Sequence, residues 1–291
     1  RVAPAIIEMG CFARVETNGG GFEQVNLLFG ENPNRAVREW TKPFHEAGIQ
    51  THMLDRALNG LRMSPVPDDV RQLFYQVKKA QGTDIARTFC GLNDVRNIIP
   101  SIGYAHDAGM ISQCCLCITY SPIHTVEYYL DMAKKLIDAG CDEICIKDMA
   151  ALLTPTRTES LVKAIKAAVP ELPLQLHTHY TSGLASMCLL KGVEAGADGI
   201  DTAISPLALG TSHAPTESMV AALSGTEFDT GLDLKQFSDI RAYFMTLREK
   251  YIKSGLLDPK MLATDANALI YQVPGGMLSN LLSQLKQAGK E

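Results

Sequence analysis

Two histidines separated by a single residue, His177 and His179, are the side chains in this sequence best suited to chemistry. They lie in a stretch with the pattern of a β-strand, and on a strand residues i and i+2 point to the same face. Two imidazoles that converge on one point commonly bind a metal ion. A pair of hydrogen-bonded core histidines is the structural alternative, but the position at the end of a strand favours the metal site.

Lys147 ends a second apolar strand, directly after Ile144-Cys145-Ile146. A buried ammonium group is costly unless it is paired or neutral. Lys147 is therefore a candidate for a Schiff-base nucleophile, for the partner of a carboxylate, or for a carbamate, formed with CO₂, that binds a metal. An ion pair with Asp148 is the structural alternative.

Arg56 ends the second predicted strand and is a candidate for substrate binding. A planar guanidinium can bind a carboxylate through two parallel hydrogen bonds, which suits a small acid. A salt bridge at the rim with Asp55 or Glu16 is the structural alternative.

A repeated pattern along the chain indicates the elements that position these side chains. A helical stretch ends in glycine and an apolar run follows at Gly10, Gly48, Gly82, Gly109, Gly140 and Gly196. Glycine takes the left-handed conformation just past a helix, so each pattern predicts a helix end followed by a strand. Six strands follow these glycines, and one further strand follows Pro170 instead. The predicted strands lie near residues 12–17, 49–54, 83–89, 110–119, 143–147, 173–178 and 198–204.

Amphipathic stretches such as residues 126–138 follow these strands, which predicts a parallel sheet. A (β/α)₈ barrel has eight strands, and this chain opens with a helical stretch at residues 2–9 rather than with a strand. The sequence therefore predicts an α/β fold, a TIM (β/α)₈ barrel lacking its first strand in this fragment. A doubly wound open sheet is the alternative, disfavoured because Gly19-Gly20-Gly21 lacks the spacing of a phosphate-binding loop.

The repeat ends near residue 225. We expect residues 1–225 to form the barrel, with its strands 2–8, and residues 226–291 to form a C-terminal helical extension, with helices at 233–253 and within 264–289. Active residues of such barrels lie at the C-terminal ends of the strands. The polar residues expected there are Glu16, Asn18, Asp55, Arg56, Asn93, Asp94, Thr119, Lys147, Asp148, His177, His179, Asp201 and Thr202.

Composition excludes several classes of function. The net charge is −5 and the 27 lysines and arginines are scattered, so no nucleic-acid surface is indicated. No apolar run approaches the roughly 18 residues that a membrane span needs.

The eight cysteines favour buried thiols in a reducing, cytoplasmic compartment over a disulfide framework. A metal site at Cys115 and Cys117 is disfavoured because no second pair stands at suitable spacing.

Several stretches together resemble the biotin-dependent carboxyltransferase domain, which is shared by the oxaloacetate decarboxylase alpha subunit, the transcarboxylase subunit acting on pyruvate, and pyruvate carboxylase. They are residues 92–97, 121–125, 147–150, 177–179, 201–205 and 272–280. The resemblance covers essentially the whole chain, and its most specific stretch is Val273-Pro274-Gly275-Gly276-Met277-Leu278-Ser279-Asn280.

The resemblance implies a metal-containing TIM barrel that moves CO₂ between carboxybiotin and the pyruvate/oxaloacetate pair. In the family a lysine, carbamylated in several members, and two histidines bind the metal, and they match Lys147, His177 and His179. The family's fourth ligand is an aspartate in an Arg-Asp-x-x-Gln-Ser motif, which this sequence does not contain. The pyruvate-binding arginine matches Arg56.

The resemblance also implies that Thr211 is catalytic, together with Lys147. Carboxyl transfer requires one proton to move between biotin and pyruvate, and a hydroxyl can accept one proton while it donates another. Related pyruvate carboxylases place a catalytic threonine in the loop that matches Thr211, after the last strand. Capping of the next helix is the structural alternative.

Cofactors and partners follow from the same resemblance. We expect one divalent ion, Zn²⁺ first and Co²⁺ or Mn²⁺ as alternatives, because nitrogen and oxygen ligands do not separate these ions sharply. The sequence has no Met-Lys-Met biotin-attachment signal, so we expect biotin on a carboxyl carrier domain or subunit that acts as partner. We also expect a homo-oligomer; assembly into a membrane decarboxylase complex through other subunits is a further alternative.

The sequence departs from the family at Asn18, Leu58, Met63 and Cys90, around the expected pocket for substrate and biotin. These departures leave the acceptor acid open. Two other functions also remain: a metal-dependent carbon–carbon lyase or aldolase of the same barrel superfamily that works without biotin, and a degenerate, non-catalytic barrel that serves as an assembly subunit.

Overall fold

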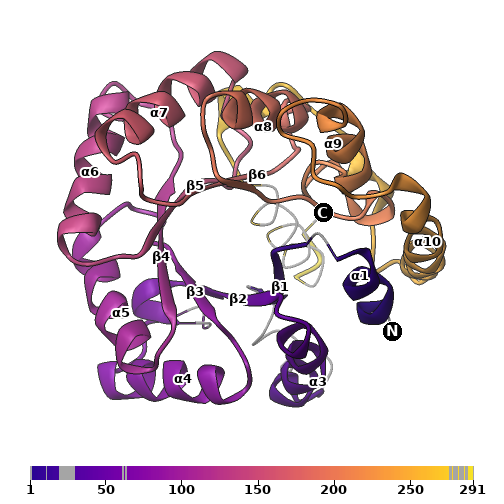
Figure 1. The fold of residues 1–291 in the computed structure, drawn as a ribbon, viewed down its shortest axis with the longest axis horizontal. Helices are drawn as coiled ribbons and strands as arrows, with labels where there is room; N and C mark the ends of the chain where they lie inside the picture. The colour runs from indigo at the N-terminus through magenta and orange to yellow at the C-terminus, as the bar shows by residue number, and fades with distance from the viewer. Residues whose placement is uncertain are drawn as a thin grey trace. The chain divides into compact units, whose positions relative to one another are not determined.

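The computed structural model describes residues 2–10, 12–19, 30–60, 62, 64–274, 277, 281, 285 and 288–290. In this part of the chain seven parallel strands form one sheet in sequence order, with helices between them (Figure 1). The strands are β1 (Arg14–Asn18), β2 (Gln50–Asp55), β3 (Ile85–Thr88), β4 (Ile111–Cys117), β5 (Glu143–Asp148), β6 (Leu174–Thr178) and β7 (Gly199–Ile200). The seven predicted strands and the predicted fold class, a TIM-like barrel lacking one strand, are confirmed.

Helices alternate with these strands as the sequence predicts. They are α1 (Ala3–Met9), α3 (Pro33–Glu46), α4 (Asp68–Ala80), α5 (Val95–Asp107), α6 (Val126–Asp138), α7 (Pro155–Ala168), α8 (Ala185–Glu194), α9 (Thr216–Leu223), α10 (Phe237–Lys253) and α11 (Ala268–Tyr271). Short 3₁₀ helices are η1 (Ala57–Asn59), η2 (Ser205–Leu207), η3 (Leu234–Gln236) and η4 (Pro259–Leu262). The helix predicted at 233–253 begins as η3 and continues as α10. The stretch 264–289 contains α11, and part of it lies outside the described residues.

Glycine ends the helices where the sequence pattern predicts it. The six glycines of the repeat have φ angles between +72° and +105°, the left-handed region that other residues adopt only at a cost. This conformation turns the chain from each helix into the next strand and explains the repeat.

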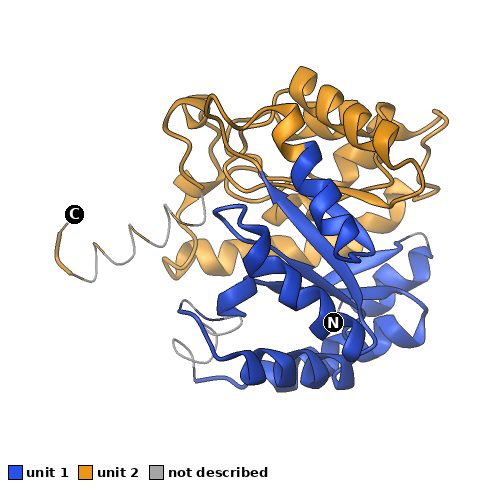
Figure 2. Cartoon of the chain, turned by 90° about the vertical axis from the view of Figure 1, so that its left-hand side faces the viewer, with its two compact units in different colours: residues 1–117, 130–145 blue, residues 118–129, 146–291 orange. Residues whose placement is uncertain are grey.

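The chain divides into two compact units (Figure 2). Unit 1 comprises residues 1–117 and 130–145, and unit 2 comprises residues 118–129 and 146–291. The predicted division near residue 225 falls inside unit 2 and stays a prediction. Within unit 2, Arg248 of α10 donates from Nη1 to the carbonyl of Pro206 in η2 at 3.3 Å, so α10 packs against η2.

In unit 1 a hydrophobic core lies between the strands and their helices. Met53 of β2 and Ala86 of β3 pack with Tyr75 of α4 and Ala105 of α5, and all four are fully buried. Neighbouring side chains on a strand point to opposite faces. The residues next to Met53 and Ala86 therefore face the other side of the sheet.

That other face of unit 1 carries a buried polar network. Arg14 of β1 donates from its two Nη atoms to Glu143 of β5 at 2.5 and 2.7 Å. Gln113 of β4 donates to the same carboxylate at 2.8 Å and accepts from Arg87 of β3 at 2.5 Å. Four strand spacings separate β1 from β5, about 19 Å in a flat sheet. The ion pair therefore requires the strands of unit 1 to curve, as in a barrel.

In unit 2, helix α8 packs against both α7 and β6. Leu161 of α7, Leu189 of α8 and Leu176 of β6 are buried in this layer.

The seven cysteines that the structure describes in the two units are buried, and no disulfide links them. None of the helices in the described residues has the length and apolar character needed to cross a bilayer.

Candidate metal centre and active site

The ends of β5 and β6 bring Lys147 and His177 into contact. Both side chains are buried, and Lys147 Nζ lies 3.2 Å from His177 Nε2. The two strands are neighbours in the sheet, and corresponding positions on neighbouring parallel strands lie side by side. The sequence prediction that these residues meet at the strand ends agrees with this geometry.

Asp148, the next residue of β5, has a different function. Its carboxylate accepts from the backbone N–H groups of Leu152 and Leu153, both at 2.8 Å, and from the Thr178 hydroxyl at 3.0 Å. Burial raises the pKa of Asp148 to about 6, against the lowering effect of these bonds. The carboxylate therefore fixes the loop after β5, and these three donors account for its burial.

His177 and His179 are held by acceptors on neighbouring segments. His177 Nδ1 lies 2.7 Å from Asp201 Oδ2, and His179 Nδ1 lies 2.6 Å from the Thr211 carbonyl oxygen. A carboxylate and a carbonyl can only accept, so Nδ1 carries the proton in each ring. The lone pair of each neutral ring is then on Nε2, the nitrogen that a metal would bind.

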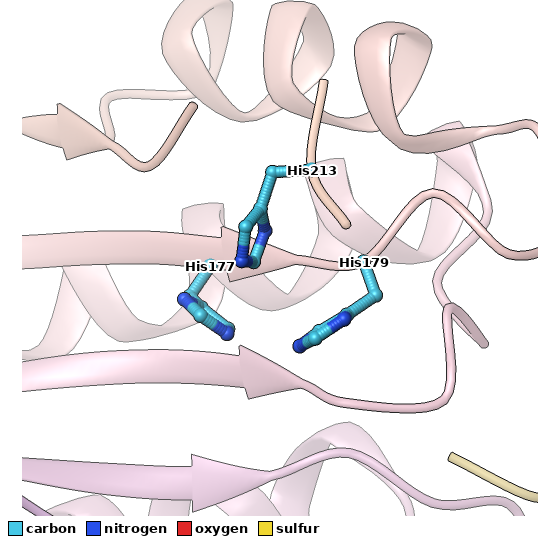
Figure 3. Close-up of side chains that lie close together, drawn as sticks. All are labelled: His177, His179 and His213. Atoms are coloured by element: carbon cyan, nitrogen blue, oxygen red, sulfur yellow. The ribbon is translucent and has the colours of Figure 1, made fainter. Parts of the chain in front are cut away.

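His213 joins the two predicted histidines. Its ring centroid lies 4.5 Å from both His177 and His179, whose own centroids are 5.3 Å apart (Figure 3). One ligand nitrogen from each of the three lies within 4.8 Å of the others. The sequence pattern does not indicate His213, because the residues of a loop follow no periodic spacing. The available signal was its position two residues after Thr211, in the loop after the last strand.

Burial keeps the imidazoles of His177 and His179 neutral. It lowers the pKa of His177 well below its usual range, and the positive charge of Lys147 adds to this effect. It lowers the pKa of His179 to about 3, with a further contribution from His213. Only the neutral ring can bind a metal, so both side chains are ready to act as ligands at physiological pH.

A second layer of contacts positions Asp201. Gln175 of β6 donates from Nε2 to Asp201 Oδ1 at 2.8 Å. A Cβ atom at Gly199 would collide with Oε1 of Gln175. Glycine at 199 therefore leaves room for Gln175, and Gln175 orients the Asp201 carboxylate that His177 contacts.

Thr211 is held through its backbone. Its N–H donates to the Met261 carbonyl at 3.0 Å, and its own carbonyl accepts from His179. Helix α9 begins only at Thr216, so Thr211 stands too far upstream to cap it. The half-buried Thr211 lies in the loop that also carries His213.

Arg56 follows β2 in unit 1. Its Nη1 donates to the Arg62 carbonyl at 3.2 Å, and its backbone N–H donates to Gly60 at 2.7 Å. Asp55 beside it accepts from Tyr75 at 2.6 Å, on the helix-facing side of β2. The histidines belong to unit 2, and the meeting of Arg56 with them stays a prediction.

The residues at which the sequence departs from the family are only partly described. Leu58 is exposed in η1, and Cys90 is buried and lies 3.4 Å from Asn97 Nδ2. Met63 lies outside the described residues, and for Asn18 the structure gives the backbone in β1.

Gln272 directly precedes the specific stretch 273–280 and contacts two residues of unit 2 that follow β4 in the sequence. Its Oε1 accepts from the Tyr120 N–H at 3.0 Å and from the Thr119 hydroxyl at 3.3 Å. The adjacent Ile118 N–H donates to the Lys147 carbonyl at 2.9 Å. Gln272 thus lies at the same end of the strands as Lys147.

The HMGL-like family model matches residues 92–243, more than half of the 291 residues of the chain. The chain belongs to the HMGL-like family. The matched HMGL-like region contains the three histidines of the cluster together with Lys147 and Thr211.

Relatives of this HMGL-like chain agree with the sequence resemblance. It is 46% identical to the B subunit of pyruvate carboxylase from Methanocaldococcus jannaschii, over 99% of this chain and 50% of that protein. It is 38% identical to the methylmalonyl-CoA carboxyltransferase 5S subunit of Propionibacterium freudenreichii subsp. shermanii, over 99% of this chain and 56% of that protein. The chain therefore spans about half the length of the curated relatives it matches.

A solved structure extends the likeness to three dimensions. The carboxyl transferase domain from Rhizobium etli pyruvate carboxylase, solved with pyruvate and biocytin, is similar with a TM-score of 0.86 at 30% identity. The match covers 96% of this chain and 47% of that one. The HMGL-like chain thus shares both sequence and fold with carboxyltransferase domains.

Proposed function

We propose that this chain transfers a carboxyl group between carboxybiotin and the pyruvate/oxaloacetate pair, in the manner of an oxaloacetate decarboxylase alpha subunit or of the B subunit of a pyruvate carboxylase. The observation that carries the proposal is the contact of Lys147 with His177, beside His179, at the ends of neighbouring strands. It occurs in a chain that aligns over 99% of its length with the B subunit of a pyruvate carboxylase.

The transfer exchanges two groups between the substrates. The carboxyl carbon leaves the ureido nitrogen of biotin and bonds to the methyl carbon of pyruvate, while one methyl proton moves to that nitrogen. In the proposal, the Thr211 hydroxyl accepts the methyl proton and donates its own to the nitrogen. Arg56 binds the pyruvate carboxylate through paired hydrogen bonds.

The donor set at the strand ends suits a divalent ion. His177, His179 and Lys147 would hold it, the two imidazoles through the nitrogens that their Nδ1 hydrogen bonds leave for metal binding. Among divalent ions we propose Zn²⁺, with Co²⁺ and Mn²⁺ as alternatives. When bound, such an ion supplies positive charge that stabilises the enolate oxygen of the keto acid.

The proposal requires a partner that carries biotin. We propose a biotin carboxyl carrier domain or subunit as this partner, a homo-oligomeric assembly, and a cytoplasmic location. The buried cysteines suit a reducing compartment. Assembly with a membrane decarboxylase through other subunits is the alternative setting.

The experiment supplies the protein with carboxybiotin labelled in its carboxyl group and with pyruvate. We expect label in oxaloacetate, formed only when both substrates are present. Cleavage of a carbon–carbon bond in an acyl substrate without biotin would favour the lyase alternative. Label that stays on biotin, in a protein that binds no metal, would favour the assembly subunit.

A further inference from the structure

His213 lies in the loop between β7 and α9, and backbone hydrogen bonds hold this loop in place. The Leu209 N–H donates to the His213 carbonyl at 2.9 Å, and the Tyr180 N–H, after β6, donates to the Ser212 carbonyl at 2.7 Å. The imidazole is thereby held beside the other two histidines of the cluster (Figure 3).

The ring of His213 is anchored between the other two. Its Nδ1 lies 2.9 Å from the carbonyl oxygen of Thr178, the residue that separates His177 from His179. Because a carbonyl only accepts, Nδ1 of His213 carries the proton and the lone pair of the neutral ring is on Nε2. All three histidines thus have the same tautomer, each fixed by a different acceptor.

We propose that His213 is a third imidazole ligand of the divalent ion, in addition to His177 and His179. The inference rests on the metal site of the proposed function and adds a ligand to it. Three histidines form a ligand set used by catalytic zinc sites, and Lys147 of the proposed function would add a fourth ligand. Such a set holds the ion through neutral nitrogens, whether Lys147 is a free amine or a carbamate.

The distances suit this role. The candidate ligand nitrogens lie within 4.8 Å of one another. Nitrogens that each lie about 2.1 Å from one ion in tetrahedral geometry are about 3.4 Å apart. Binding therefore requires the ligand nitrogens to approach one another by up to about 1.4 Å, which side-chain rotation can provide.

The experiment measures Co²⁺ binding to the metal-free protein, in competition with a chelator. The wild type should bind one ion, and His213→Ala should bind it at least about 10-fold more weakly, since loss of even an outer partner of a ligand costs 10–100-fold. His124→Ala is the matched control. It removes a half-buried histidine of the same unit that contacts Ser121, and it should bind as the wild type does.

A second variant separates ligation from loop support. His213→Gln keeps a side-chain donor for the Thr178 carbonyl, so it should fold and still bind weakly if His213 is a ligand. X-ray absorption of the zinc-loaded proteins should count three imidazoles in the wild type and two in His213→Gln. Wild-type affinity in His213→Gln, or two imidazoles in the wild type, would overturn the proposal.

His177→Ala tests the underlying site independently. If His177→Ala loses the metal and His213→Ala keeps it at full affinity, only the role of His213 is wrong. If His177→Ala itself keeps stoichiometric metal at full affinity, the metal site of the proposed function is wrong as well.

Discussion

At the scale of single residues, each imidazole of the cluster depends on one acceptor for its orientation. His179 and His213 use backbone carbonyls, whereas His177 uses the carboxylate of Asp201. Asp201 is therefore the acceptor that a substitution can change without moving the main chain. Its own orientation depends on Gln175, which donates to its other oxygen.

Asp201→Asn should weaken metal binding by about 10–100-fold, because the amide no longer fixes the His177 tautomer through a charged acceptor. Metal affinity is measured by chelator competition. Asp198→Asn is the control, since this half-exposed carboxylate lies directly before β7 and accepts from the Leu174 N–H at 2.8 Å. Equal affinities in the two variants would remove Asp201 from the site.

Thr211→Ala should keep the bound metal and the keto acid but lose most carboxyl transfer, whereas Thr211→Ser should retain some. The reason is that Thr211→Ala removes the hydroxyl together with the γ-methyl group and Thr211→Ser removes only the methyl, while the backbone bonds of Thr211 to Met261 and His179 persist in both. Rates of label transfer check this. A wild-type rate in Thr211→Ala would shift the proton transfer to another group.

A buried lysine in unit 1 makes stability depend on pH. Burial, with the charge of Arg38, lowers the pKa of Lys78 to about 7, although Gln81 accepts from its Nζ at 3.0 Å. Between pH 7 and 10 the unfolded chain binds this proton more tightly than the folded chain. The free energy of unfolding should therefore rise with pH in this window, by at most about 1.4 kcal/mol per pH unit from this group.

Lys78→Met should remove that rise, whereas Lys79→Met, which changes a more exposed neighbour on α4, should preserve it. Urea unfolding at pH 7, 8 and 9 measures the slope for each variant. An unchanged slope in Lys78→Met would mean that other groups cause the pH dependence.

Side-chain alternation explains which site residues the sequence could predict. Lys147 and His177 occupy strand positions, and His179 directly follows β6 at the spacing that keeps it on the face of His177, so spacing alone predicts that they lie together. The sequence predicts Asp55 among the polar residues at the strand ends. Side-chain alternation instead places Asp55 on the face of the sheet that packs against the helices, where it contacts Tyr75. His213 was missed because the path of a loop depends on backbone bonds between distant segments, which leave no periodic pattern.

At the scale of elements, the segment around η4 holds the loop that carries Thr211 and His213. Met261 accepts from Thr211 N–H at 3.0 Å, and the Asp265 N–H donates to the Thr181 carbonyl at 2.7 Å. The segment therefore contacts the loops after both β6 and β7. This contact depends on Gly210, where φ is +52° and a Cβ atom would collide with the Met261 carbonyl oxygen.

Gly210→Ala should lower the free energy of unfolding and also reduce carboxyl transfer, because the loop must move away from Met261. Gly255→Ala is the control: φ there is +75°, and no atom lies within 4 Å of the added carbon. The control should lose only about 1–2 kcal/mol for its left-handed backbone and keep its activity. Equal stability and activity in both variants would show that the contact with Met261 does not position the loop.

The strands and helices themselves were predictable because their signals are local. Glycine turns and apolar runs predict each strand to within a few residues. The strand predicted at 198–204 is shorter in the structure, Gly199–Ile200, because the chain turns after Asp201 into the loop that leads to η2. The contact between η4 and Gly210 joins residues far apart in the sequence, and no local pattern indicates it.

At the scale of the whole molecule, the proposed reaction needs more than this chain. Relatives that match it are about twice as long. In the proposed reaction, the carboxyl group arrives on a biotin carrier and leaves on a keto acid. The histidine cluster, Lys147, Thr211 and Arg56 are the part of this reaction that the chain itself would provide.

The most direct test of the central claim follows label from a carboxylated biotin carrier to pyruvate in the wild type, in His177→Ala and in the control His124→Ala. The wild type and His124→Ala should form labelled oxaloacetate at equal rates. His177→Ala should be slower by at least about 100-fold, comparable to the loss of one electrostatic stabiliser of a transition state. Transfer by His177→Ala at the wild-type rate, or no transfer by the wild type, would contradict the claim.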